Sequence, residues 1–279
     1  MHPFLIQVGG ASEEVAEVKN MKIPGPGGDI PIRIYYPKGN GPFPVLVLIH
    51  GGGWFVGNLD TNDKISRSLT NRTPCMVVSV DYRLAPEHKF PAVAQDAYEA
   101  TKWVADNASR INGDQSRIAV CGDSAGGNLA AVVCLMAKDK GHPSIAYQVL
   151  IYPILDVSSF DRDSYQEYGE GYLVSLDGMK FSKDSYIRRE EDVLDPYVSP
   201  LLASDLSGLP PTLILNAEFD VLKDEGIAYA NRLKQAGVEV THANYDTMTH
   251  GFFTMAAMFD KANDAINEVA TALHEVFTK

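Results

Sequence analysis

The sequence predicts an α/β fold built on a mostly parallel sheet of eight strands with helices on both faces. Short apolar runs alternate along the chain with longer amphipathic segments, as in repeated β–α units. Most of these runs are apolar on both faces, which is typical of buried parallel strands. The length of 279 residues and an apolar content of 45% suit a sizeable core, so we expect residues 1–279 to form a single domain.

The first two strands are expected to pair antiparallel at one edge of the sheet. Glu17–Ile23 and Ile30–Tyr36 alternate more between polar and apolar residues, and a turn rich in proline and glycine joins them. The runs expected to form the parallel part are Val45–Ile49, Cys75–Val80, Arg117–Cys121, Tyr147–Tyr152, Thr212–Asn216 and Val238–Tyr245.

The segments between the strands carry helix formers and helix-ending residues. Pro91 suits a first helical turn, and Gly237 suits the position just after a helix end. The predicted helices are Asp60–Asn71, Pro91–Asn107, Ser124–Lys138, Asp224–Ala236 and Asp260–Thr278.

One connection is too long for an ordinary link between two strands. Residues 156–202 contain Tyr, Asp, Glu and Arg with weak helical periodicity, and they lie between two predicted strands. We expect this insertion to form a small helical cap, because the strand ends on either side of it lie near the candidate site. A surface excursion without function is the alternative.

Charge and composition exclude several classes of partner. The formal net charge is −12 with no basic stretch, so nucleic acid and anionic membrane surfaces are poor partners. No apolar stretch approaches the roughly 20 residues that span a bilayer, and the N-terminus does not read as a signal peptide, so a cytoplasmic protein is expected. The three cysteines are expected to be buried free thiols, because they suit neither a disulfide framework nor a metal site.

A candidate nucleophile lies between a predicted strand and a predicted helix. Residues 122–126 read Gly-Asp-Ser-Ala-Gly and fit the pattern G-x-S-x-G, in which a tight turn exposes a serine. Glycines permit such a turn, and the partial positive charge of the helix N-terminus favours an oxyanion. Ser124 is therefore the candidate nucleophile, and a glycine–serine turn without chemistry is the alternative.

The candidate base is His250. A serine hydroxyl is a weak nucleophile and needs a base, and the chain offers seven histidines. His250 lies in the loop between the last predicted strand and the terminal helix, from which a side chain can approach the carboxyl edge of the sheet. By contrast, His242 lies within a predicted strand, and His50 is expected to brace a glycine-rich loop.

The candidate acid is Asp220, which follows the strand Thr212–Asn216. The chain order of serine, acid and then histidine is the order expected for this type of turn. The acid would hold the imidazole tautomer and stabilise the imidazolium. Glu218 is the competing acid, whereas Asp224 and Glu225 are expected to cap and charge the first turn of the next helix.

A glycine-rich loop is the candidate oxyanion site. Residues 50–54 read His-Gly-Gly-Gly-Trp and directly follow the strand Val45–Ile49. Without side chains, the backbone N–H groups can face a substrate oxygen, together with the N–H of the residue after the nucleophile, here Ala125. A flexible turn is the alternative.

Several short motifs occur in an order that is typical of one enzyme family. They are residues 50–54 (HGGGW), 81–87 (DYRLAPE), 122–127 (GDSAGG), 195–200 (DPYVSP), 218–220 with 224–225, and 250–252 (HGF). In this combination they resemble the hormone-sensitive-lipase-like family of esterases, or bacterial family IV, of the α/β-hydrolase superfamily. The resemblance implies an α/β-hydrolase core with a cap, hydrolysis of carboxylic esters, and no metal or cofactor.

The resemblance also implies roles for individual residues. Carried over by position, the roles are nucleophile for Ser124, acid for Asp220, base for His250, and oxyanion donors for Gly52, Gly53 and Ala125. Asp81 and Glu87 match a motif that looks structural and holds the loop beneath the site. Members of the family usually carry a longer N-terminal segment than residues 1–17, so we expect a reduced cap and a more open, wetter site.

The sequence therefore predicts a serine carboxylesterase that acts on short- to medium-chain acyl esters through an acyl-enzyme. An amidase or deacetylase with the same three residues is one alternative, and a non-catalytic small-ligand receptor on the same scaffold is another. The complete set of nucleophile, acid and base speaks against the receptor. An exposed edge strand or the terminal helix could support a homodimer.

Overall fold

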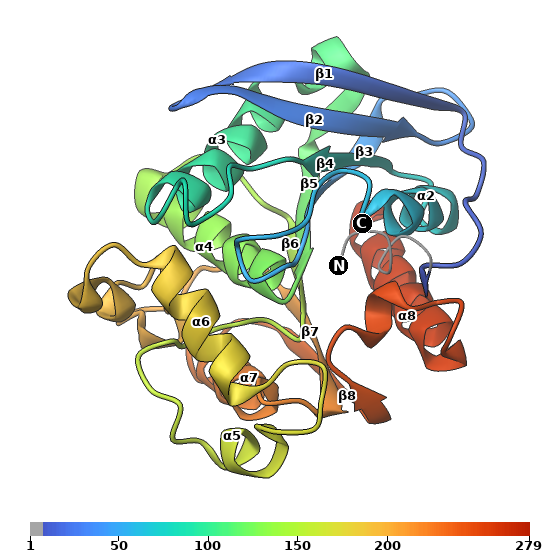
Figure 1. Ribbon diagram of the computed structural model, residues 1–279. Coiled ribbons are helices and arrows are strands. Elements are labelled where there is room, and N and C mark those ends of the chain that lie inside the picture. The colour runs from blue at the N-terminus through green and yellow to red at the C-terminus, as the bar shows by residue number, and fades with distance from the viewer. Residues whose placement is uncertain (1–7) are drawn as a thin grey trace.

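Eight strands form one sheet in the computed structural model, which describes residues 8–279 (Figure 1). The strand order is β1-β2-β4-β3-β5-β6-β7-β8. The predicted N-terminal segment 1–17 falls partly on residues 1–7, which lie outside the described part of the chain. The strands are β1 Glu17–Gly25, β2 Gly28–Tyr36, β3 Phe43–Ile49, β4 Met76–Val80, β5 Gly113–Asp123, β6 Tyr147–Ile151, β7 Thr212–Phe219 and β8 Val240–Thr249.

The sheet is antiparallel at one edge and parallel elsewhere. β1 pairs antiparallel with β2, and β2 pairs antiparallel with β4. Every other neighbouring pair of strands is parallel. The predicted edge pair and the mostly parallel sheet are therefore confirmed. Because parallel strands end at the same edge, the loops after β3, β5, β7 and β8 meet at one side of the molecule.

Several strands are longer than the sequence predicts, and β5 and β8 extend furthest beyond a predicted end. β5 begins at Gly113, and β8 continues to Thr249. Both extensions are polar and largely exposed or half-buried, so they lack the apolar signal, and pairing with a neighbouring strand extends them instead. In β8 the extension follows a register shift and brings Thr249 opposite Phe219, so the residues that follow these two strands start side by side.

Helices cover both faces of the sheet, as predicted (Figure 1). α2 and α8 pack on one face, and α3, α4 and α7 pack on the other. In α8, Ala262, Ile266, Val269 and Leu273 recur at intervals of three and four residues and are fully buried. No helix within residues 8–279 is long and apolar enough to cross a bilayer. These helices are α2 Asp63–Arg72, α3 Ala92–Asp106, α4 Ala125–Lys140, α7 Lys223–Gln235 and α8 Asp260–Phe277.

The long connection between β6 and β7 is helical. It contains α5 (Asp163–Tyr168), α6 (Leu176–Tyr186) and two 3-10 turns, η2 (Glu190–Leu194) and η3 (Pro200–Leu202). Figure 1 shows α5 and α6, in yellow, on the side of the sheet that carries α7. The hydroxyl of Ser175 accepts the N–H of Gly178 at 3.1 Å and thereby caps α6, which explains why the helix begins there.

The three cysteines are buried free thiols, as predicted. Burial raises the pKa of Cys75 to about 12, and it also raises the pKa values of Cys121 and Cys134. At neutral pH the three side chains are therefore protonated and contribute to the core as small apolar groups.

Candidate active site

Three side chains from different strand ends meet at the carboxyl edge of the sheet. Ser124 follows β5, Asp220 follows β7 and His250 follows β8. The Nε2 atom of His250 lies 2.9 Å from Ser124 Oγ, and its Nδ1 atom lies 2.7 Å from Asp220 Oδ2. Relative exposure is 9% for Ser124, 2% for Asp220 and 6% for His250, so water has little access to these contacts. The structure thus brings together the three residues that the sequence singles out.

These hydrogen bonds define one tautomer of His250. An ionised carboxylate can only accept, so Nδ1 carries the proton and donates it to Asp220. Nε2 is then free to accept the hydroxyl proton of Ser124. The ring of Tyr152 packs against the imidazole with the two centroids 4.5 Å apart, which restricts rotation of the imidazole.

Ser124 lies in a strained turn between β5 and α4. Its backbone has φ 56° and ψ −119°, a region that residues other than glycine rarely adopt. Glycine is required beside it, because a Cβ on Gly126 would clash with the backbone of Ile49 and His50. The N–H of Ser124 donates to the carbonyl of Ile151 at 2.8 Å, which ties the turn to β6. The sheet therefore holds the serine hydroxyl at the N-terminus of α4.

Asp220, and not the competing Glu218, faces the imidazole. The second oxygen of Asp220, Oδ1, accepts the N–H of Leu222 at 3.0 Å, which orients the carboxylate. Glu218 is partly exposed and accepts the N–H of Thr247 at 2.5 Å. The register between β7 and β8 shifts just before Phe219, and Glu218 and Asp220 therefore face different surroundings.

The glycine-rich loop after β3 is held from several directions. The N–H of Gly51 donates to Asp123 Oδ1 at 3.0 Å. His50 contacts the carbonyl of Gly51 through Nδ1 at 2.8 Å and stacks on Tyr82, whose hydroxyl donates to the carbonyl of His50 at 2.8 Å. His50 therefore braces this loop, as the sequence analysis expects.

Three backbone N–H groups in the segments next to Ser124 have no acceptor in the described part of the chain. Within residues 8–279, the N–H groups of Gly52, Gly53 and Ala125 donate to no other group of the protein. By contrast, the N–H of Gly51 already donates to Asp123 Oδ1. The predicted donors thus lie in the loop after β3 and at the first residue of α4.

The support of the loop beneath the site differs from the prediction. Neither the partly exposed Asp81 nor the exposed Glu87 forms a side-chain hydrogen bond or ion pair within residues 8–279. Arg83 instead forms a bidentate contact with the buried Asp96, with Nε–Oδ2 and Nη2–Oδ1 distances of 2.7 and 2.8 Å. A planar guanidinium matches a carboxylate in this way and fixes both chain segments. Sequence reasoning missed this pair because its partners lie on different elements.

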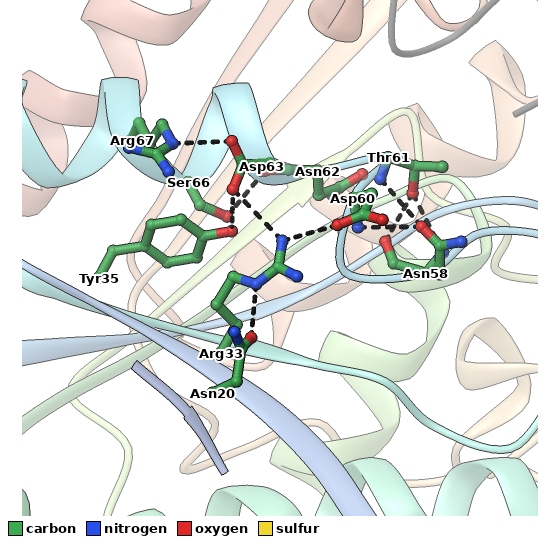
Figure 2. A network of polar contacts seen from close by, with 10 residues as sticks. All are labelled: Asn20, Arg33, Tyr35, Asn58, Asp60, Thr61, Asn62, Asp63, Ser66 and Arg67. Carbon is green, nitrogen blue, oxygen red and sulfur yellow. Dashed lines mark hydrogen bonds and ion pairs between the residues drawn. The ribbon is translucent and has the colours of Figure 1, made fainter. Parts of the chain in front are cut away.

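A polar network fixes the turn that leads into α2. Figure 2 shows Arg33 of β2 between the carboxylates of Asp60 and Asp63, at 2.8 and 3.4 Å. Asp63 also accepts the hydroxyl of Tyr35 at 2.8 Å and Nε of Arg67 at 2.7 Å. Burial and the neighbouring Asp63 raise the pKa of Tyr35, so its hydroxyl stays a donor. Asp60, which precedes α2, and Asp63, at its start, are therefore bound to the antiparallel edge of the sheet.

This network positions one wall of a pocket. Thr61 and Asn62 lie between the two acids of the network, and both line the pocket beside Ser124. The amide of Asn62 also lies 3.5 Å from Asp123 Oδ1, the atom that accepts the N–H of Gly51. Burial raises the pKa of Asp123, opposed by these donors and by His250.

The pocket has a volume of about 280 Å³ and opens beside Ser124 and His250. The glycine-rich loop forms one wall, and residues of the insertion form another. No group of three or more His, Cys, Asp or Glu side chains in the described chain is arranged to hold a metal ion. The apolar side chains of the lining are Phe55, Val56, Ile154, Leu173, Val174, Met179 and Met255.

Asp224 and Glu225 lie in the first turn of α7, as predicted, but they bind the insertion and do not cap the helix. The residue before α7 is Leu222, and no side chain caps this end. Asp224 Oδ2 accepts the N–H of Ser164 at 2.8 Å, and the hydroxyl of Ser164 donates to the carbonyl of Val221 at 2.6 Å. The segment that carries Asp220 is therefore tied directly to α5.

Glu225 anchors the start of the insertion from a fully buried position. Its Oε2 accepts the N–H groups of Leu155 and Asp156 at 2.5 and 2.6 Å, and its Oε1 accepts the hydroxyl of Tyr165 at 2.9 Å. Burial raises the pKa of Glu225 to about 8, although these donors oppose the shift. A helical sequence pattern cannot reveal such a role, because the partners lie far away along the chain.

A sheet of this topology with a buried serine, histidine and aspartate at its carboxyl edge defines a hydrolase of the α/β class. A family model described as "alpha/beta hydrolase fold" matches residues 46–254, and the chain belongs to this family. The resemblance to hormone-sensitive-lipase-like esterases that the motifs predict is confirmed.

Individual relatives agree with this assignment. The chain is 44% identical over 263 residues to the carboxylic ester hydrolase LipN of Mycobacterium tuberculosis, covering 92% of this chain and 70% of that protein. It is 40% identical over 243 residues to an arylesterase of Saccharolobus solfataricus, covering 86% of this chain and 78% of that protein. A solved hyperthermophilic esterase from the archaeon Pyrobaculum calidifontis matches with a TM-score of 0.95 at 42% identity, covering 98% of this chain and 90% of that chain.

Proposed function

We propose that this protein is a serine carboxylesterase that hydrolyses short- to medium-chain acyl esters through an acyl-enzyme. The observation that carries the proposal is the hydrogen-bonded chain from Asp220 through His250 to Ser124 beside an apolar pocket. The relatives are named as ester hydrolases, which supports ester over amide cleavage. The complete set of nucleophile, base and acid argues against a non-catalytic receptor.

The reaction follows from the direction of these hydrogen bonds. His250 Nε2 takes the proton of Ser124 Oγ while the oxygen attacks the ester carbonyl. Asp220 keeps Nδ1 protonated and stabilises the imidazolium. His250 then gives its proton to the leaving alcohol, and the acyl group stays on Ser124. A water molecule deprotonated by His250 attacks the acyl-enzyme, and Ser124 leaves with the proton.

The N–H groups of Gly52, Gly53 and Ala125 stabilise the oxyanion in this scheme. Each tetrahedral intermediate places a negative charge on the former carbonyl oxygen, where preorganised donors are more effective than water. Loss of one such donor typically costs roughly 3–4 kcal/mol of transition-state stabilisation.

Residues 156–202 act as a cap on a single domain formed by the whole chain. A Cβ placed on Gly53 would lie 2.9 Å from Ser182 Oγ, which supports close packing of α6 over the glycine-rich loop. The pocket volume of about 280 Å³ is close to the lower end of the range of about 300–1,000 Å³ that is common for ligand pockets, which supports short- to medium-chain esters. A cytoplasmic location and a homodimer stay predictions.

The substitution Ser124→Ala tests the proposal. Turnover of p-nitrophenyl butyrate is expected to fall by about a million-fold in kcat. Ser207→Ala, on the exposed surface, is the matched control and should keep wild-type turnover. A fluorophosphonate probe should label the wild type and the control, but not Ser124→Ala. Labelling or turnover that survives in Ser124→Ala would reject Ser124 as the nucleophile, and cleavage of amides without cleavage of esters would reject the substrate class.

A further inference from the structure

One face of α6 forms part of the pocket wall. The residues of this helix and its cap that line the pocket are Ser175, Gly178, Met179 and Ser182. Intervals of three and four residues place them on one helical face. Asp177, in the same turn, instead exposes 94% of its side chain to solvent. The pocket-facing side of α6 is therefore defined by both spacing and exposure.

Gly178 leaves a gap on this face. It lies within a regular helix, where glycine is less favourable than alanine. No other element crowds this position. Apart from its chain neighbours and the local helix backbone, a Cβ on Gly178 would meet within 4 Å only the capping hydroxyl of Ser175, in a close contact of 3.3 Å. Gly178 is also exposed, as expected for a residue at the mouth of an open pocket.

Other glycines of the pocket have a different physical reason. Gly52, Gly53 and Gly251 have positive φ values of 117°, 58° and 84°. A Cβ on Gly251 would also lie 3.0 Å from Leu173 Cδ2. These positions require glycine for the backbone, whereas at Gly178 the absent side chain leaves room at the pocket.

Apolar side chains line the same pocket, and one of them, Phe55, contacts a further exposed ring. Leu173 lines the pocket and exposes 57% of its surface, and Met179 lies next to Gly178 on the lining face. The rings of Phe55 and Phe181 meet edge to face with their centroids 5.2 Å apart. An exposed apolar rim of this kind is stabilised when a hydrocarbon chain covers it.

We propose that Gly178 determines substrate size, because its missing side chain admits the extended hydrocarbon part of an ester between α6 and the catalytic serine. A larger residue at position 178 fills this room and shortens the chains that the enzyme accepts. This inference rests on the proposed esterase function.

The test compares a series at position 178 with a matched series at position 177. Gly178→Ala, Gly178→Leu and Gly178→Phe add increasing volume on the pocket face, and Asp177→Leu and Asp177→Phe add similar volume on the solvent face. The measurement is kcat/KM for p-nitrophenyl acetate, butyrate, octanoate and decanoate, and for a matched series of alkyl acetates.

In Gly178→Leu, the ratio of kcat/KM for octanoate over acetate is expected to fall by about tenfold or more, with a further fall in Gly178→Phe. In the position 177 variants, the ratio should stay close to that of the wild type. A shift in the acyl series or in the alkyl series supports the inference and identifies which arm of the ester occupies the room. The inference would be overturned if the ratio of kcat/KM for long over short esters changed to the same extent at both positions in both series.

Two further comparisons keep the result interpretable. Gly178→Ala adds only one methyl group, which lies close to Ser175 Oγ. Its melting temperature shows whether it folds, and its smaller shift in the same direction is the measure if the larger variants do not fold. An unchanged ratio in a folded Gly178→Ala and Gly178→Leu pair contradicts the inference. Ester turnover that does not depend on Ser124 would instead contradict the proposed function.

Discussion

The two walls of the pocket are built in different ways. The wall formed by the loops after β3 and β5 depends on backbone geometry, with a positive φ at Gly52 and at Ser124 and with Gly51 tied to a buried carboxylate. The wall formed by α6 depends on side chains at helical spacing. Carboxylates of Asp224 and Glu225 anchor the insertion that carries it.

We infer that the loop wall serves the chemical step and that the α6 wall serves selection of the substrate. A nucleophile and its oxyanion donors must keep their positions within fractions of an ångström, which a strained and hydrogen-bonded backbone next to a buried sheet can ensure. A helix face can change its size with one side chain while its backbone stays in place. We therefore expect substitutions on the loop wall to lower the rate for all esters, and substitutions on the α6 wall to change which esters are accepted.

The largest effect that would sharpen this comparison is expected at Asp220. Asp220→Asn keeps the shape but cannot hold His250 in the required tautomer, so kcat should fall by about 10,000-fold for short and long esters alike. Glu218→Gln is the matched control and should have nearly wild-type kcat, because Glu218 contacts Thr247 rather than His250. Equal losses in both variants would contradict the assignment of the acid.

The next largest effect is expected at Glu225, which anchors the insertion, and it concerns the free energy of unfolding rather than the catalytic rate. Burial raises the pKa of Glu225 to about 8, so near pH 6 the folded chain holds a proton here that an unfolded chain releases at about pH 4.3. The stabilising contribution of this protonation is present below about pH 4.3 and is lost as the pH rises through about 8. Glu225→Gln has no such titration.

Urea unfolding at several pH values checks this prediction. The unfolding free energy of the wild type relative to Glu225→Gln should fall by a few kcal/mol between about pH 5 and about pH 9, since one pKa unit corresponds to about 1.4 kcal/mol. A relative stability that rises with pH would show that the three donors to Glu225 favour the carboxylate more than burial disfavours it.

The smallest of the three effects is expected at Asp123, on the loop wall. Asp123→Ala removes the acceptor for the N–H of Gly51, and a slight displacement of the next two glycines should lower kcat by about 10- to 100-fold. Asp123→Asn keeps an oxygen acceptor, so it should lose less. The ratio of activity on long and short esters should not change in either variant. A changed ratio would break the proposed division between the two walls.

Local patterns predict the parts of the molecule that depend on neighbouring residues. The apolar run before Ser124 and the alanine-rich segment after it identify the strand and the helix, and the glycines around the serine identify the turn. The order of Ser124, Asp220 and His250 along the chain points to the three residues that the structure brings together. These features are readable because strand ends and tight turns impose requirements on consecutive residues.

The remaining features need partners that are far apart in the sequence. The polar extension of β8 forms because β7 pairs with it, and no apolar pattern announces it. The sequence does not distinguish Arg83 from the other residues of its loop, and only the fold brings it into contact with Asp96. Glu225 looks like an acid in a first helical turn, and only the packing of the insertion buries it.

By itself, the sequence determined the sheet with its alternating helices, the three candidate catalytic residues and the glycine-rich loop, because each depends on periodicity, turn chemistry or chain order. Tertiary structure decided how α6 lines the pocket, which acid faces the imidazole and which carboxylates hold the insertion. These outcomes depend on distances between segments and on burial, and a buried carboxylate is oriented by the donors that surround it rather than by its neighbours in the chain.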